Sequence, residues 1–169
     1  VQRDDQGSAW VPISGDLTTY GDRVEAKAVA LDGGVSVDWQ VIDPAPKKTF
    51  SGKIKLQQGW YRLDLRLMKG VQNLAETSSP QFGVGEVFII AGQSNSANHG
   101  KPVQVSKSPK VGEWGPNGWR HAVDPLPIAT GTGGSPWPVL GDLLVAKFGV
   151  PVGFISVGWG GTRVEWWQP

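Results

Sequence analysis

The chain has 169 residues, 39% of them hydrophobic, which is enough to bury the core of one ordinary domain or of two small ones. Its 16 basic and 15 acidic residues are interspersed, with a formal net charge of +1, so the basic patch of a nucleic-acid-binding protein is absent. No apolar run is long enough to span a membrane. Cysteine is absent, which excludes disulfides, thiolate metal sites and a thiol nucleophile, and no cofactor is implied.

Residues 1–83 are expected to form a small all-β module. Apolar and charged side chains alternate over residues 61–67, the period-2 pattern of a strand with one buried and one exposed face. Similar stretches occur at residues 24–31, 35–41 and 49–56, and turn signals rich in Gly, Pro and Asp separate them. Short strands at this spacing predict a β-sandwich of the immunoglobulin-like kind.

This module contains no catalytic constellation. We expect it to cover one side of a second domain, residues 84–169, or to present an edge that contacts sugar. A jelly-roll carbohydrate-binding module is the alternative, and the lack of an aromatic cluster in this half weighs against it. The boundary segment, residues 77–84, is polar and then extended, and it leads directly into the next strand, so the two domains are expected to pack together.

The stretch from Glu86 to Gly100 contains the first candidate site. Val87–Ala91 is apolar throughout, as in a strand buried on both faces, and Gly92-Gln93-Ser94-Asn95 suits a tight turn that begins a helix. The Ser94 hydroxyl would then be exposed at the carboxyl end of a strand, with backbone N–H groups facing whatever it attacks. Ser94 is therefore a candidate nucleophile, and the alternative is that it only caps the helix.

Residues 101–135 are rich in Pro and Gly and show no periodicity, which indicates an irregular loop forming one wall of a cleft beside Ser94, or a disordered segment. A helix is predicted after Ser135, with apolar residues at helical spacing up to Phe148 and Gly149 as its C′ residue. The apolar strand Val152–Val157 follows, so strand, helix and strand should form a βαβ unit with two parallel strands.

A second motif, Gly158-Trp159-Gly160-Gly161-Thr162-Arg163-Val164-Glu165-Trp166, follows that strand. Together with Gly92-Gln93-Ser94-Asn95, it resembles the SGNH hydrolases, and within them the carbohydrate-esterase branch that includes sialate O-acetylesterases and acetyl xylan esterases. The resemblance covers residues 84–169. It implies an α/β fold with a flavodoxin-like parallel sheet, incomplete in this chain, that the β-sandwich precedes.

The resemblance also implies a reaction. Ser94 Oγ would attack an ester carbonyl, an O-acetyl group on a sugar, and the N–H groups of Ser94 and of Gly160 or Gly161 would hold the oxyanion. An ordinary tight turn is the alternative for Gly160-Gly161. The resemblance further implies an extracellular or periplasmic location. It assigns oxyanion or substrate-binding roles to Gln93, Asn95, Gly161, Thr162 and Trp159.

The chain departs from this family at the catalytic base. The family's Asp-x-x-His motif is absent, and the histidines are His99 and His121. On a helix, His99 would lie about 140° around the axis from Ser94, too far to reach its hydroxyl, and His121 falls in the irregular segment.

Two strands and one helix are also too few for a covered parallel sheet. We therefore expect this chain to be the N-terminal piece of a longer hydrolase, with a C-terminal fragment or second chain supplying the remaining sheet and the histidine. The alternative is a non-catalytic glycan-binding or scaffolding protein that keeps the Ser94 turn as a relic.

Overall fold

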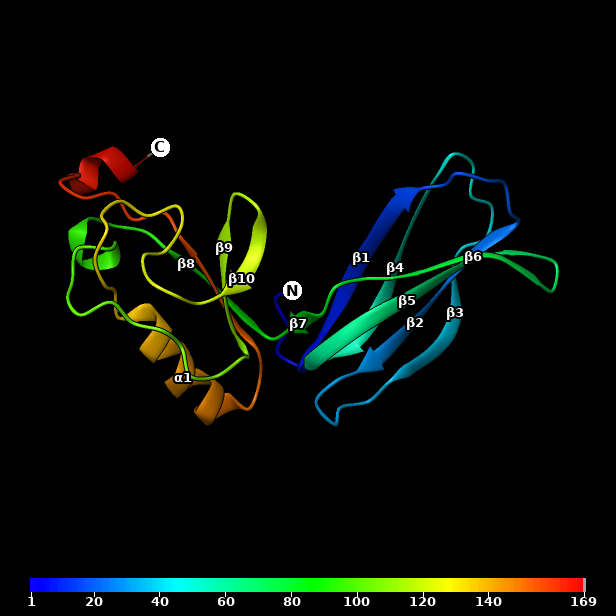
Figure 1. Cartoon of the computed structure of the whole chain (residues 1–169), viewed down its shortest axis with the longest axis horizontal. Helices are drawn as coiled ribbons and strands as arrows, with labels where there is room; N and C mark the ends of the chain where they lie inside the picture. Colours follow the sequence, from blue (N-terminus) through cyan, green and yellow to red (C-terminus); the bar gives the residue numbers. More distant parts are fainter. Residues whose placement is uncertain (169) are drawn as a thin grey trace. The chain divides into compact units, whose positions relative to one another are not determined.

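The computed structural model describes residues 1–168, and the chain divides into two compact units, Val1–Val84 (unit 1) and Gly85–Pro169 (unit 2). The boundary predicted from the sequence, after residue 83, lies one residue before the boundary between these two units. Most of the regular structure is β-strand, and the described residues contain a single α-helix (Figure 1).

Unit 1 consists of two antiparallel sheets that face one hydrophobic core. In one sheet β1 pairs with β4, and in the other the order is β3-β2-β5-β6, with β7 also paired to β5. The strands are β1 (Ser8–Asp16), β2 (Arg23–Ala30), β3 (Val37–Asp43), β4 (Thr49–Gln57), β5 (Gly59–Lys69), β6 (Gln72–Ser78) and β7 (Phe82–Val84).

Alternate residues of both sheets fill this core, as the period-2 pattern requires. On β5, Tyr61, Leu63 and Leu67 are buried while Arg62 points to solvent. The core also takes side chains from β1, β2 and β4, among them Val11, Val24, Ala26, Ile54 and Leu56. The two sheets therefore bury their apolar faces against each other, and the immunoglobulin-like character of the unit stays a prediction.

Unit 2 contains a four-stranded sheet in the order β10-β9-β11-β8. β11 runs parallel to both of its neighbours, and β10 is antiparallel to β9. The helix α1 lies beside this sheet and packs on β11 and β9 (Figure 1). The elements are β8 (Glu86–Ile90), η1 (Ser94–Ser96), β9 (Val111–Gly115), β10 (Gly118–His121), α1 (Trp137–Phe148), β11 (Val152–Ser156) and η2 (Val164–Trp167).

The predicted α/β class, with an SGNH or flavodoxin-like parallel sheet, is wrong for this chain. The parallel pairing of β8 with β11 is present, with Phe88 opposite Phe154. However, a doubly covered parallel sheet needs helices on both faces, and the described part of unit 2 has only α1. The chain as a whole is a strand-rich molecule whose sheets are antiparallel or mixed.

Two local predictions fail for identifiable reasons. The segment after Ser94 forms one 3₁₀ turn rather than an α-helix, because Ser, Asn and Gly make up most of residues 94–100 and favour turns, and the segment has no apolar stripe to bury. Within the predicted loop 101–135, β9 and β10 form a hairpin. The Asn117-Gly118 pair at its turn is the signal that could have revealed it, and Gly118 has φ +97°.

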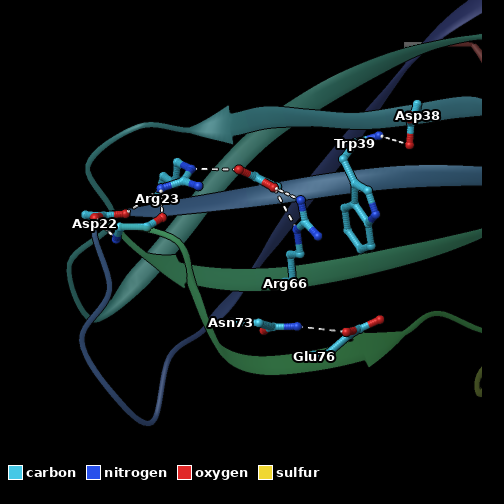
Figure 2. A network of polar contacts seen from close by, with 9 residues as sticks. Asp22, Arg23, Asp38, Trp39, Arg66, Asn73 and Glu76 are labelled. Atoms are coloured by element: carbon cyan, nitrogen blue, oxygen red, sulfur yellow. Dashed lines mark hydrogen bonds and ion pairs between the residues drawn. The ribbon is translucent and has the colours of Figure 1, made fainter.

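A buried carboxylate joins two strands on the outer face of unit 1. Glu25, 7% exposed, accepts hydrogen bonds from Arg23 Nε at 2.6 Å and from Arg66 Nε at 2.7 Å. The two arginines approach from β2 and β5, and the Arg66 guanidinium lies 4.1 Å from the centroid of the Trp39 ring (Figure 2). The hydrogen bond from Arg23 is the main cause that lowers the pKa of Glu25, with Arg66 acting in the same direction and burial opposing both.

We predict that Glu25→Gln lowers the free energy of unfolding by about 1–3 kcal/mol at pH 7, because hydrogen bonds to a charged group are lost. Since the folded pKa lies below the unfolded one, the contribution is present above the unfolded pKa and disappears as pH falls through the folded pKa. Urea denaturation at pH 7 and pH 3 checks this. Glu76→Gln, at a carboxylate that accepts from Asn73, is the matched control. A wild-type advantage of equal size at both pH values would contradict the prediction.

Candidate functional site

The two sequence motifs lie side by side at the carboxyl ends of β8 and β11. The N–H of Val157 donates to the Ile90 carbonyl and the N–H of Trp159 to the Gly92 carbonyl, both at 2.8 Å, which extends the parallel pairing beyond the strands. A methyl group at Gly158 would lie 2.7 Å from Ser96 Oγ, so glycine is needed there for the two segments to touch.

Ser94 begins the 3₁₀ turn and is half-buried. Its Oγ donates a hydrogen bond to Gln93 Oε1 at 3.1 Å. Within residues 1–168 no hydrogen bond engages its backbone N–H, so this donor is free for a ligand. The hydroxyl is thus accessible, and its present partner is an amide oxygen and not a base.

Thr130 connects the second motif to the first. Its hydroxyl oxygen accepts the Gly160 N–H at 2.7 Å, and its own N–H donates to the Gly158 carbonyl at 3.0 Å. The Asn98 N–H donates to the Thr130 carbonyl at 2.9 Å. The N–H of Gly160, one of the two predicted oxyanion donors, is therefore already engaged. The N–H of Gly161 has no partner within residues 1–168, and Gly161 has the positive φ of +78° that favours glycine.

Asn98 holds the loop that carries Thr130. Its buried side chain accepts the Leu126 N–H at 2.8 Å and donates to the carbonyls of Leu126 and Ala129 at 2.9 and 3.1 Å. Sequence reasoning missed both Asn98 and Thr130, because an Asn or Thr in a loop has no pattern that distinguishes a buried hydrogen-bonding side chain from a solvated one.

The two histidines lie on different segments and have different hydrogen-bond partners. His99 is exposed, with Nε2 3.4 Å from Thr130 Oγ1, and the helical geometry that argued against it does not exist here. His121 ends β10, and its Nε2 lies 2.9 Å from the Ser106 carbonyl. Neither contacts Ser94 Oγ among the described residues, so the present arrangement includes no base for this hydroxyl.

Ser94 borders a surface depression of about 700 Å³. Asn95, His99 and Lys101 are among its polar lining residues, and the exposed side chains of Val139 and Leu143 on α1 are among its apolar ones. This volume falls in the range of small-molecule sites. Ser94 and Asn95 are the predicted site residues that line it.

The other predicted residues lie outside this lining. Gln93 is exposed beside Ser94, and Trp159 is 63% exposed. Thr162 Oγ1 donates to the Trp159 carbonyl at 2.8 Å and accepts from Trp167 Nε1 at 3.0 Å. In this structure Thr162 therefore stabilises the turn between Trp159 and Thr162.

Unit 2 also buries a carboxyl group that sequence reasoning did not single out. Glu113 on β9 is 1% exposed, and its Oε1 accepts from Arg120 Nε at 2.6 Å, while Oε2 has no hydrogen-bond partner among the described atoms. Burial raises the pKa of Glu113, and Arg120 opposes that shift. The group lines no part of the depression beside Ser94.

Comparison with known proteins finds a likeness to a solved structure. No protein-family model matches the chain, and no curated protein matches it. The crystal structure of a novel carbohydrate acetylesterase from Xanthomonas citri superimposes with a TM-score of 0.54 and 17% sequence identity, covering 99% of this chain. The match spans 39% of that structure's chain. At this identity the likeness concerns the fold, which both units share with part of a longer protein.

Two features are absent from residues 1–168. No cluster of three or more His, Cys, Asp or Glu side chains is arranged to hold a metal ion. No helix is both long and apolar enough to cross a membrane.

We predict that Thr130→Val destabilises the turn at Gly160 by about 1 kcal/mol, because the Gly160 N–H loses its acceptor. Amide hydrogen exchange at Gly160 measures this directly, and the exchange rate should rise several-fold. Thr130→Ser keeps the hydroxyl and should leave the rate near the wild-type value. Equal rates in Thr130→Val and wild type would show that this hydrogen bond does not hold the turn.

Proposed function

We propose that this chain carries the nucleophile of a serine esterase that removes O-acetyl groups from carbohydrate, with Ser94 as the nucleophile. The observation that carries the proposal is the position of Ser94: a half-exposed hydroxyl after β8, with a free backbone N–H, at the edge of a depression of about 700 Å³. The fold shared with a carbohydrate acetylesterase, and the motif resemblance at residues 92–95 and 158–166, support it further.

The proposed reaction is acyl transfer. Ser94 Oγ attacks the ester carbonyl as its proton leaves to a base, and the N–H groups of Ser94 and Gly161 stabilise the oxyanion. Collapse of this intermediate breaks the bond to the sugar oxygen, which takes up a proton and leaves, and water then hydrolyses the acetyl-enzyme. Losing one oxyanion donor typically costs about 3 kcal/mol of barrier, so the Gly161 N–H would contribute substantially to the rate. Gly160 would contribute only after releasing Thr130 Oγ1.

A further polypeptide segment is proposed to complete the site. β8 is the last strand of its sheet, and Ile89 on it is 73% exposed, so both an edge and an apolar side chain are available for pairing. Because Ser94 Oγ contacts Gln93 here, the base is assigned to this additional segment, from the same polypeptide or from a second chain. Sialic acid or xylan-type glycans are the proposed carriers of the acetyl group, and the proposed location is extracellular or periplasmic.

The second candidate function is non-catalytic glycan binding or scaffolding. The hydrogen bond from Ser94 Oγ to Gln93, without a histidine at the hydroxyl, favours it. The exposed indoles of Trp159 and Trp166, 63% and 68% exposed, could stack on sugar rings.

We predict that, in the protein that includes the segment supplying the base, a fluorophosphonate probe labels Ser94 and that Ser94→Ala abolishes the label. Hydrolysis of 4-nitrophenyl acetate should fall at least about 100-fold in the same variant, because the covalent step is lost. Ser14→Ala, at an exposed serine of β1, is the matched control. Equal hydrolysis by wild type and Ser94→Ala would remove the esterase proposal and leave glycan binding.

A further inference from the structure

The imidazole of His99 lies directly against the glycine turn that follows β11. A methyl group built on Gly160 would lie 2.7 Å from His99 Nε2, and one built on Gly131 would lie 3.0 Å from the same atom. Contacts this short are rare or absent for real Cβ atoms, so the lack of a side chain at both positions leaves room for the ring. Although His99 as a whole is exposed, its Nε2 edge is therefore bordered by backbone from two other segments.

Thr130 makes the polar contact with that edge of the ring. Its Oγ1 lies 3.4 Å from His99 Nε2 and accepts the Gly160 N–H at 2.7 Å. A hydroxyl can donate one proton and accept at two lone pairs, so Thr130 still has its own proton to donate after accepting from Gly160. Among residues 1–168, His99 Nε2 is the acceptor within hydrogen-bond range of that hydroxyl. The three groups can thus form a chain of hydrogen bonds, from the Gly160 N–H through the Thr130 hydroxyl to the imidazole.

This chain affects how firmly the turn is held. Hydrogen bonds in series polarise one another, so a Thr130 hydroxyl that donates to His99 is a better acceptor for the Gly160 N–H. A stronger bond at Gly160 restrains the turn in which the next residue, Gly161, has an N–H without a partner among the described residues. When Nε2 of a neutral histidine accepts a hydrogen bond, its ring proton lies on Nδ1. The chain therefore requires one particular tautomer of His99.

We propose that His99 is a positioning residue for the oxyanion donors. Its neutral imidazole accepts the Thr130 hydroxyl and, through Thr130, holds the Gly160 turn so that the Gly161 N–H stays available to the developing oxyanion. The inference rests on the proposed esterase function, and it gives this histidine a role other than that of the base. In this role His99 contacts no reacting atom and takes no proton from Ser94.

NMR spectroscopy of this chain tests the hydrogen-bond chain without turnover. At about pH 8, where a histidine side chain is ordinarily neutral, ring nitrogen shifts should place the proton of His99 on Nδ1, and Thr130→Val should move it toward Nε2. Amide exchange at Gly160 should rise about threefold in His99→Phe, which keeps a ring without an acceptor, and stay near the wild-type rate in His99→Gln. A wild-type proton on Nε2, or equal exchange in the two variants, would overturn the proposal.

Kinetics distinguish positioning from a general structural role. In the protein that includes the segment supplying the base, His99→Phe should lower kcat for 4-nitrophenyl acetate about threefold without raising KM, because a less firmly held donor stabilises the transition state less. The same change should have no further effect in Thr130→Val, where the chain is already broken. His121→Phe, at the other histidine, is the matched control and should leave kcat unchanged.

Two kinetic outcomes would contradict the role of His99: a loss of the same size in both backgrounds, or no loss in His99→Phe alone. Failure of the proposed function gives a different result, because a fluorophosphonate that does not label Ser94 would remove the esterase proposal. The tautomer and the exchange rates at Gly160 need no catalytic activity, so they still decide whether His99 holds the turn.

Discussion

The arrangement at Ser94 depends on a few hydrogen bonds that hold irregular backbone in place. Thr130 joins the glycine turn after β11 to the segment after β8, and the buried amide of Asn98 fixes the loop on which Thr130 lies. Few apolar side chains support this region: its core cluster is Ala97, Leu126 and Ala129. Since a buried polar group costs free energy when its partner is lost, each of these bonds constrains the site more than an exposed one would. The backbone donors proposed for the oxyanion are therefore positioned by side chains outside the two motifs.

The strands that can be predicted from the sequence lie in stretches with a regular apolar pattern. Residues 87–91 and 152–157 are apolar enough to identify two strands, and their parallel pairing brings the ends that follow them together. The second strand is largely buried, but the predicted burial of the first on both faces is wrong, because Phe88 and Ile89 are exposed. The alternation over residues 61–67 likewise identifies β5 and its buried face. These signals are strong because burial on one or both faces restricts many consecutive side chains at once.

The elements that could not be predicted from the sequence lack a burial pattern that extends over many consecutive residues. In β1, Trp10 and Pro12 lie on the exposed face, which hides an alternation that is present in the structure. In β9, glycines and the buried Glu113 interrupt the apolar pattern, so the strand is visible only through its turn and its pairing. The role of Asn98 arises from the three-dimensional path of the chain, which no local pattern encodes. A motif resemblance gave the site a chemical interpretation and also led to a fold class that the sheets do not have.

The carboxyl group of Glu113 has a consequence for how unit 2 forms. Because burial raises its pKa, the folded unit keeps a proton there at pH values where the unfolded chain has released it. Between the unfolded and the folded pKa of Glu113, folding is accompanied by proton uptake at this group, so its contribution to stability falls as the pH rises through that range. Once ionised, the same group carries its charge inside the sheet, where Arg120 is its ion-pair partner. Loss of this proton therefore weakens the hairpin of β9 and β10.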